Sequence, residues 1–257
     1  MRRSALATTG VACIVMSAGL CAQESPVHAP DGRAPQLIEP LYFAPKPNAP
    51  FTATARTLVV DTLPDGSTTT SENSRLVTRD GEGRIFQERA TFVPKPNLGR
   101  ESRVHATDYT DPIEHKHYHC DMAAKVCNLF DYDAPVIAVA APAAPQPGGK
   151  TYLVREDLGT DTFAGLEVQH SRETLTIYSQ TVGNTRNILR TVEYWYSPAL
   201  GVNVQVKRHD PRDGDQTLWL TDLVLDAADP EMFKVPADFR VIDHRNPQAV
   251  RAGNANR

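Results

Sequence analysis

Three histidines at alternate positions are the clearest candidate metal ligands in this sequence. His115, His117 and His119 occupy one run, and residues two apart on a β-strand share a face. Because a strand rises about 3.3 Å per residue, the outer two lie about 13 Å apart, too far for one ion. His117 and His119 could bind zinc or copper with a ligand from a neighbouring strand. The alternative is a polar face whose imidazoles titrate near neutral pH.

Cys120 and Cys127 are predicted to form a disulfide that closes a β-hairpin. They are the two cysteines that remain once the N-terminal segment described below is removed. Outside the cytosol, an even number of cysteines at short spacing favours a disulfide over a metal site or a reactive thiol. A redox-active pair would need the Cys-x-x-Cys spacing, which this sequence lacks.

Motifs that activate a nucleophile or bind a phosphate group are missing. The sequence has no Gly-x-Ser-x-Gly, Ser-x-x-Lys or His-Glu-x-x-His motif and no phosphate-binding glycine loop. The turn acids Asp210, Asp213 and Asp215 lack the alternate spacing of a calcium loop and are expected to be solvated. We therefore assign no catalytic residue, expect no cofactor and predict a non-catalytic protein. A hydrolase with paired carboxylates stays open, because such acids can come from anywhere in a chain.

A second group of candidate site residues is aromatic and aliphatic. Trp195 and Trp219 belong to strands expected to be neighbours, where they either fill a core or line a cavity for an apolar ligand. The predicted lining of such a cavity is Tyr194, Trp195, Val204, Trp219, Leu220 and Phe233.

The elements that would position these residues are antiparallel strands. Val202, Val204 and Val206 alternate with polar residues, as a half-buried strand requires. Glycine-containing turns such as Asp213-Gly214 separate runs of this kind. The predicted strands are 52–61, 67–78, 84–93, 103–109, 114–121, 126–133, 150–155, 166–177, 188–196, 202–209 and 216–226.

The N-terminus has the features of a secretory signal peptide. Arg2 and Arg3 precede an uncharged stretch that ends in small residues at Ala22. Cleavage there would make the protein periplasmic or secreted, with no transmembrane span. The alternatives are a retained membrane anchor and lipidation at Cys21.

Proline and glycine divide the rest of the chain. Seven prolines between residues 26 and 50 predict an extended tether, because proline cannot sustain a helix or a central strand. One helical turn is expected after Asp229, which would cap it. The predicted organisation is a signal peptide at 1–22, a tether at 23–50, one β-rich domain at 51–244 with an Ala/Pro-rich loop at 134–149, and a disordered tail at 245–257.

Composition restricts the class of partner. The chain has 257 residues, 40% hydrophobic and 23% charged, which fits one globular domain plus unstructured length. The net charge is −4 and no run of five or six basic residues occurs, so a nucleic-acid-binding protein is excluded. The oligomeric state is not indicated by the sequence.

An ordered set of C-terminal motifs resembles a known superfamily. Its elements are Tyr194-Trp195-Tyr196-Ser197-Pro198, then Asp213-Gly214, then Asp229-Pro230-Glu231-Met232-Phe233-Lys234-Val235-Pro236. This set resembles the bacterial periplasmic lipoprotein-carrier (LolA/LolB-like) superfamily, and is nearest to a group of uncharacterised secreted bacterial proteins with a Phe-x-Val-Pro ending. The similarity covers roughly residues 189–241.

The resemblance implies a mainly β fold, a curved antiparallel sheet or open half-barrel with few short helices. Its apolar concavity would take an acyl chain or a partner chain in the cell envelope, without turnover. The chain differs from the superfamily where the proline-rich tether replaces an N-terminal amphipathic helix. Two other functions stay open: metal binding through His117 and His119, and an interaction or sensor module whose tether sets its reach.

Overall fold

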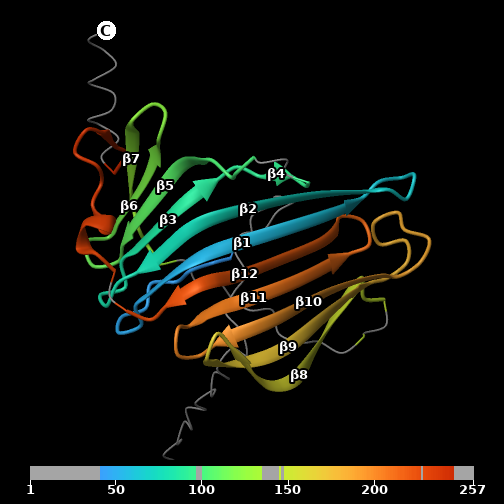
Figure 1. Ribbon diagram of the computed structural model, residues 1–257. Helices are drawn as coiled ribbons and strands as arrows, with labels where there is room; N and C mark the ends of the chain where they lie inside the picture. The colour runs from blue at the N-terminus through green and yellow to red at the C-terminus, as the bar shows by residue number, and fades with distance from the viewer. Residues whose placement is uncertain (1–40, 97–99, 135–144, 146–147, 227, 246–257) are drawn as a thin grey trace, which may run out of the picture.

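Strands of alternating polarity build one curved, open sheet (Figure 1). The computed structural model describes residues 41–96, 100–134, 145, 148–226 and 228–245. The predicted fold class, a mainly β protein with a curved antiparallel sheet and few short helices, is confirmed. The described elements are β1 Phe51–Thr62, β2 Thr68–Arg79, β3 Ile85–Ala90, β4 Val93–Pro94, β5 Val104–Asp111, β6 Lys116–Asp121, β7 Val126–Asp131, β8 Thr151–Phe163, β9 Leu166–Ile177, β10 Ile188–Ser197, β11 Val202–Asp210, β12 Gly214–Val224, the 3-10 turn η1 Pro230–Phe233, and β13 Arg240–Asp243.

The first strand joins the two halves of the chain at the middle of the sheet. β1 pairs with β2 on one side and with β12 on the other, so Thr57 has Asn73 and Leu218 as its neighbours. The strand order is β13-β7-β6-β5-β3-β2-β1-β12-β11-β10-β9-β8, and β4 pairs with β2. Both sides of the predicted 134–149 loop therefore contribute to a single layer.

One face of this sheet carries most of the main hydrophobic core. The three valines of β11 that alternate in the sequence have no exposed area, and Val206 pairs with Leu218 of β12. Because alternate side chains point to one face, the apolar set of each strand is buried together. The core residues are Leu41, Phe43, Phe51, Ala53, Ala55, Val77, Ile85, Val168, Tyr194, Trp195, Leu200, Val202, Val204, Val206, Leu218 and Leu220.

The last ten residues of the predicted tether pack against the sheet. Leu41 and Phe43 are each 5% exposed and belong to the main core, where the rings of Phe43 and Phe51 lie 6.0 Å apart. Lys46 donates a 2.7 Å hydrogen bond from Nζ to the carbonyl oxygen of Pro198. The burial of Leu41 and Phe43 therefore outweighs the tendency of the prolines to keep this segment extended in solvent.

A buried arginine holds this segment in place. Arg79, the last residue of β2, has no exposed area and donates to backbone carbonyl oxygens. Its Nε and Nη2 donate to the carbonyl oxygen of Ala49 at 2.9 and 2.7 Å, and Nη1 donates to that of Ala44 at 2.8 Å. Nη2 also donates to Leu200 in the β10–β11 turn at 2.6 Å, so one guanidinium ties together three chain segments.

The strands differ most from the predicted ones in three places, and elsewhere their ends differ by one or two residues. The predicted strand 84–93 is divided into β3 and β4, which pair with different parts of β2. The predicted strand 150–155 extends to Phe163 as β8, a mostly exposed edge strand whose acidic residues conceal the pattern. The short parallel strand β13 was not predicted, since a four-residue edge strand with one half-buried side chain has no clear alternation.

Several predicted segments lie outside the described residues. These are the signal peptide 1–22, the tether residues 23–40, most of the 134–149 loop and all of the tail after residue 245. Within the described part of the chain, no helix is both long and apolar enough to cross a membrane.

The predicted disulfide is confirmed. Cys120 of β6 pairs directly with Cys127 of β7, and their sulfurs are bonded across the hairpin. Both residues have no exposed area. They lie beneath the C-terminal segment in a second apolar cluster, whose fully buried members are Phe86, Tyr109, Cys120 and Cys127.

Replacing both cysteines by alanine is expected to lower the free energy of unfolding by about 2 to 3 kcal/mol, because the unfolded chain regains the freedom of a short loop. Urea denaturation of the double variant, beside the wild type under oxidising conditions, measures this loss. A change below about 0.5 kcal/mol, the range of ordinary surface substitutions, would contradict it.

Candidate functional site

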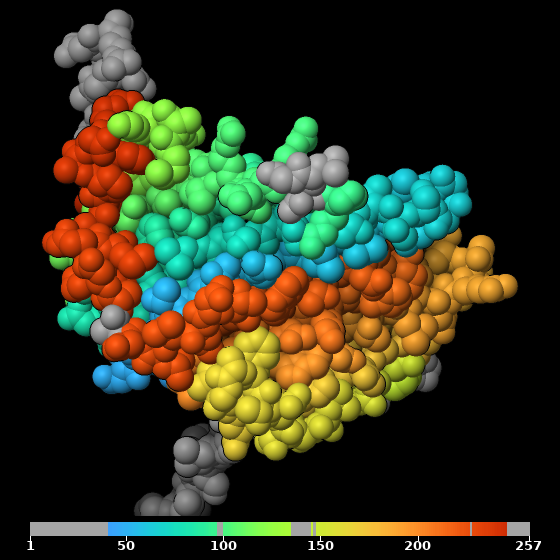
Figure 2. Space-filling view, viewed as in Figure 1, coloured from blue at the N-terminus to red at the C-terminus, as the bar shows by residue number. Residues whose placement is uncertain are grey.

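The C-terminal segment crosses the face of the sheet opposite the main core. Asp229 caps η1 by accepting a 2.9 Å hydrogen bond from the backbone N–H of Glu231, and Pro230 starts the turn, as predicted. Met232 and Phe233 then pack on the cluster around Tyr109. The chain continues to β13, which pairs with β7, and the space-filling view shows this red segment lying against the green strands (Figure 2).

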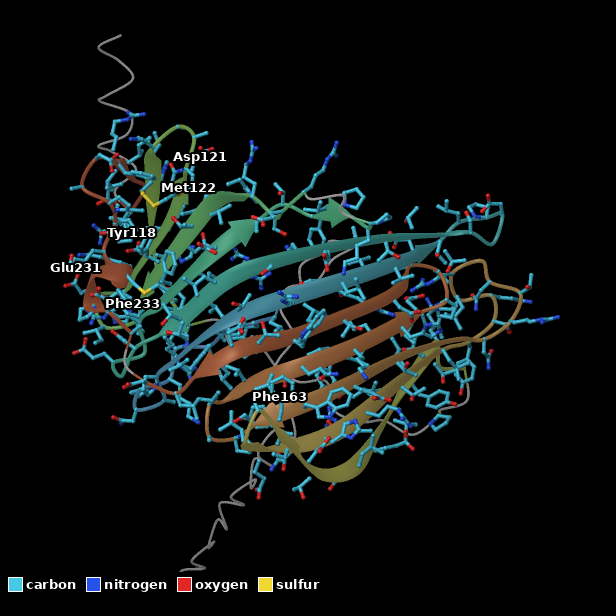
Figure 3. The ribbon with its side chains drawn as sticks, in the orientation of Figure 1. Tyr118, Asp121, Met122, Phe163, Glu231 and Phe233 are labelled. Carbon is cyan, nitrogen blue, oxygen red and sulfur yellow. A yellow bond between two sulfur atoms is a disulfide. The ribbon has the colours of Figure 1, made fainter. Side chains whose placement is uncertain are left out.

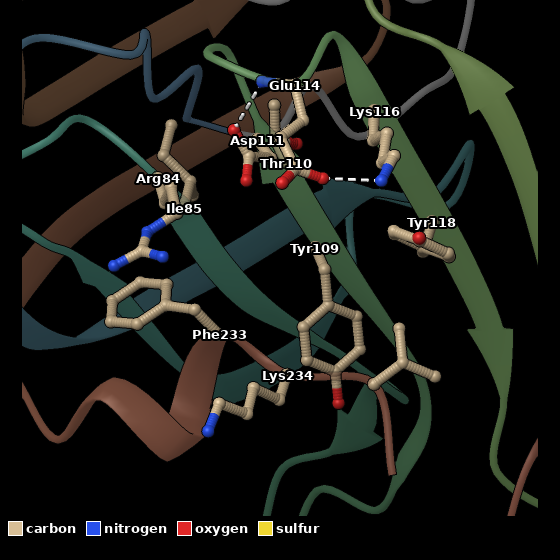
Figure 4. Close-up of a pocket in the computed structure, with 11 residues that line it drawn as sticks. Arg84, Ile85, Tyr109, Thr110, Asp111, Glu114, Lys116, Tyr118, Phe233 and Lys234 are labelled. Atoms are coloured by element: carbon tan, nitrogen blue, oxygen red, sulfur yellow. Dashed lines mark hydrogen bonds and ion pairs between the residues drawn. The ribbon is translucent and has the colours of Figure 1, made fainter. Parts of the chain in front are cut away.

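A pocket of about 280 Å³ lies between this segment and the sheet. Phe233 and Tyr118 both lie on this side of the molecule, whereas Phe163 lies away from them, at the end of edge strand β8 (Figure 3). Strands β3, β5 and β6 supply most of the inner wall, and Phe233 at the end of η1 supplies the outer one with the two residues that follow (Figure 4). The lining residues are Arg84, Ile85, Tyr109, Thr110, Asp111, Glu114, Lys116, Tyr118, Phe233, Lys234 and Val235.

Aromatic rings form much of the pocket wall because two tyrosines are paired across strands. Tyr109 of β5 lies directly opposite Tyr118 of β6, on the face that η1 covers. Burial raises the pKa of the Tyr109 hydroxyl, so this group stays protonated at neutral pH and can donate a hydrogen bond. Phe233 completes the wall from the C-terminal segment.

The three cations of the pocket are each held by a carboxylate. Arg84 Nε lies 2.6 Å from Asp80, and this hydrogen bond raises the pKa of the guanidinium. The guanidinium carbon also lies 5.6 Å from the centre of the Phe233 ring, within reach of a cation–π interaction. Lys116 is bonded to Glu114, which raises the pKa of Lys116, as Figure 4 shows.

The lining combines an aromatic wall with charged groups at its rim. Lys234 Nζ is bonded to Glu231 at 2.5 Å, so each cationic group at the rim is already neutralised. The lining contains neither histidine nor cysteine, and its one hydroxyl of a nucleophilic type belongs to Thr110. A partly aromatic wall with a polar rim whose cations are paired can take an apolar group and hydrogen-bond its polar end.

The structure brings four of the six predicted cavity residues together, but in the packed main core, where Trp195 joins the three named next. Tyr194, Val204 and Leu220 are at most 2% exposed and belong to the main core. Phe233 lines the pocket described above. Trp219 is half-buried on the opposite face from Leu220, as strand alternation requires.

The second tryptophan is enclosed by polar neighbours as well as by the core. The Trp195 ring stacks on His170 with ring centres 4.2 Å apart, and Lys207 Nζ lies 5.1 Å from its centre on the same strand face. Its Nε1 donates a 3.3 Å hydrogen bond to Asp161. These contacts cover the Trp195 ring, so little of it is accessible to a ligand.

The candidate metal ligands are engaged by other side chains. His117 Nδ1 lies 3.0 Å from the Thr110 hydroxyl, and His119 Nδ1 lies 2.7 Å from a carboxylate oxygen of Asp108. His115 has left the strand, since β6 begins at Lys116. The described residues contain no group of three or more His, Cys, Asp or Glu side chains placed to hold a metal ion.

His117 is expected to make the fold less stable in mild acid. Burial lowers the pKa of this imidazole below its ordinary value of 6.5, so the folded state favours the neutral form. The stability that this provides is present above pH 6.5 and is lost as the pH falls through the lower folded-state pKa. We expect His117→Asn to reduce the difference in unfolding free energy between pH 7 and pH 5.

Urea denaturation at the two pH values measures the effect. His105, which is exposed, provides the matched control when replaced by Asn. An equal pH dependence in the wild type and in His117→Asn would refute this expectation.

Most of the pocket residues were not predicted from the sequence, although the sequence contains a pattern that indicates some of them. Histidines at 117 and 119 on one face require Tyr118 and Cys120 to share the other. The disulfide register and this alternation together predict an aromatic face beside the bridge. The contribution of Lys234 and Val235 had no such signal, because it depends on where the chain goes after β12.

Comparisons with known proteins find similarity at the level of structure. No family model and no curated protein matches the chain. An uncharacterized conserved protein from Thermus thermophilus has 11% identity and a TM-score of 0.37, over 77% of this chain and 91% of that one. LprF from Mycobacterium bovis has 9% identity and a TM-score of 0.29, over 74% and 90%.

A LolA superfamily protein from Nitrosomonas europaea is also similar, with 8% identity and a TM-score of 0.25 over 74% of this chain and 91% of that chain. The superfamily that the C-terminal motifs resemble is thus named among the structural matches. At these TM-scores the matches describe neither a shared site nor a shared ligand, and the function is argued from the pocket.

Proposed function

We propose that this is an exported, non-catalytic protein that binds the apolar part of a ligand or partner chain beside Phe233. The observation that carries the proposal is the 280 Å³ pocket, with its aromatic wall and a polar rim whose cations are paired. Small-molecule sites are largely apolar, with a few polar groups that orient the ligand, and start at about 300 Å³. A pocket of this size suits the end of an acyl chain or one apolar side chain of a partner.

The opposite face of the sheet is the other position for an acyl chain. A concavity there would open between Tyr194, Val204 and Leu220, which the sequence suggested as lining. Each of them is at most 2% exposed, so a ligand would have to separate packed side chains. The pocket beside Phe233 needs no such separation.

The part of this proposal that concerns export rests on the sequence. Cleavage after Ala22 would leave a periplasmic or secreted protein, and the proline-rich residues 23–40 would space the sheet from whatever the N-terminus contacts. The cell envelope is a compartment in which acyl chains and the apolar segments of other proteins are both present. No structural observation on the described residues favours the metal-binding or sensor alternatives over this one.

Replacing Phe233 by alanine is expected to weaken binding of dodecanoate by about ten- to a hundredfold, since burying a phenyl group contributes roughly 1.5 to 3 kcal/mol. Isothermal titration of the protein lacking residues 1–22 measures the affinity. Native mass spectrometry after mild extraction tests separately for co-purified lipid.

Phe163→Ala is the matched control. Phe163 is half-buried and packs on the main core at the other end of the sheet, so this variant loses a similar side chain without altering the pocket. The proposal fails if neither dodecanoate nor an acylated peptide binds the wild type. It also fails if both phenylalanine variants bind as well as the wild type.

A further inference from the structure

A cluster of charged residues with two buried members, Arg75 and Asp108, lies on the face of the sheet that carries most of the main core. Asp108 of β5 is directly opposite His119 of β6, and its side chain is only 3% exposed. Arg89 of β3 donates from Nε to one Asp108 oxygen at 2.5 Å, and His119 Nδ1 lies 2.7 Å from the other. Both oxygens of this carboxylate therefore have a partner within the cluster.

Two donors of a second arginine in the cluster lack a partner among the residues that the structure describes. Arg75 of β2 is 6% exposed, and its Nε and Nη2 are buried without any hydrogen-bond acceptor. Burial, followed by the charge of Arg89, lowers the pKa of Arg75 to about 10, so the guanidinium is still charged at neutral pH. The negative charge of Asp108 has the opposite effect and raises the pKa of Arg75. The two carboxylate oxygens of Asp108 are, however, already bonded to Arg89 and His119.

The charges of this cluster do not balance. Arg75 and Arg89 carry two positive charges against the one negative charge of Asp108, and a protonated His119 would add to the excess. Of the other acids on these strands, Asp121 accepts the backbone N–H groups of the β6–β7 turn and is exposed, and Glu88 accepts the backbone N–H of Leu76. A buried guanidinium with no acceptor is strongly disfavoured, and the usual remedies are an ion or an ordered water.

We propose that Arg75, supported by Arg89, forms a binding site for a carboxylate or phosphate group. The planar fork of a guanidinium offers two parallel N–H donors to such an oxyanion, and Nε and Nη2 are a pair of this kind. The ligand supplies the negative charge that the cluster lacks. Because both nitrogens are covered, the anion reaches them through a local opening of the packing over Arg75.

This site is separate from the pocket beside Phe233. Asp108 and His119 alternate along their strands with Tyr109 and Tyr118, which line that pocket, so the two sites lie on opposite faces. The anion site can therefore exist whether or not the proposed apolar site does. A ligand could be a free anion or the head group of an amphiphile, since both present the same oxygens.

Nuclear magnetic resonance of the arginine Nε–Hε groups tests the site in the protein lacking residues 1–22. The probes are inorganic phosphate, dodecyl phosphate and, as a neutral amphiphile, dodecyl maltoside. We expect an anionic probe to shift the Arg75 Nε–Hε resonance and, at a hundred times its Kd, to raise the melting temperature by about 5 to 10 °C.

Two methionine variants make the test specific. Arg75→Met removes the unpaired charge and should fold without loss of melting temperature, while lowering anion affinity at least about tenfold, as expected for a charged hydrogen bond. Arg56→Met is the control, because Arg56 is exposed on the opposite face of the neighbouring strand β1. It should bind the anion as the wild type does.

The outcomes separate the possible ligands. A response to phosphate alone supports a soluble anion, and a response only to dodecyl phosphate supports a head group, provided that Arg75→Met abolishes it. The proposal is overturned if no anionic probe moves the Arg75 resonance, or if Arg75→Met binds the probe unchanged. Phe233→Ala should leave the phosphate response intact, so failure of either site is distinguishable from failure of the other.

Discussion

Replacing Arg79 by methionine is expected to lower the free energy of unfolding by about 3 to 5 kcal/mol, because hydrogen bonds from a charged donor are lost and buried acceptors are left unsatisfied. The variant leaves the carbonyl groups of Ala44, Ala49 and Leu200 without the donors that satisfy them. It also removes the guanidinium from the Phe51 ring, whose centre is 5.0 Å from the Arg79 Cζ. Methionine fills much of the same volume, so the loss reports hydrogen bonds more than packing.

Urea denaturation of Arg79→Met beside Arg56→Met measures this loss. Arg56 is exposed, and its replacement should change the unfolding free energy by no more than about 0.5 kcal/mol. Arg79→Lys should be intermediate, because an ammonium is a point charge that cannot span three carbonyl groups. If Arg79→Met were as stable as Arg56→Met, the guanidinium would not hold residues 44–49 to the sheet.

Gly214→Ala is expected to cost about 3 kcal/mol or more, because strain in the backbone and a clash with it add together. Gly214 starts β12 with a φ of +84°, a conformation that residues with a Cβ rarely adopt. A Cβ at this position would lie 2.2 Å from the Val60 carbonyl oxygen and 3.0 Å from the Asp61 Cα. Both atoms belong to the backbone of β1, which cannot move without disturbing the central pairing.

Gly66→Ala separates the two contributions. Gly66 has the same φ of +84°, but a Cβ there would meet nothing within 4 Å. Its replacement should cost about 1 to 2 kcal/mol, the strain alone. Thermal and urea denaturation of both variants give the difference, and equal losses would show that β1 yields to the added carbon.

Local patterns predicted those parts of the fold that depend on neighbours in sequence. Alternation identified the strand around Val204, and the spacing of Cys120 and Cys127 predicted the register of their hairpin, which is confirmed. The cap at Asp229 predicted the turn that starts the C-terminal crossing. In each case the residues that determine the structure lie within a few positions of one another.

The rest depends on contacts between distant segments. Arg79 is fully buried. Because arginine is ordinarily exposed, the sequence would place this residue at the surface. The packing of Leu41 and Phe43 was concealed by the prolines around them. The pocket needs Phe233 to meet Tyr118, and that meeting depends on the route of the chain between β12 and β13.

The pairing of β1 with β12 has a consequence for how the protein is made. A nascent chain leaves the ribosome with β1 and β2 long before Val224 is synthesised, and until then one edge of β1 has no partner. Such long-range pairing closes slowly and leaves an apolar edge that other chains can add to. Until its last long strand is complete, the newly made polypeptide therefore exposes a strand edge to which other chains can add.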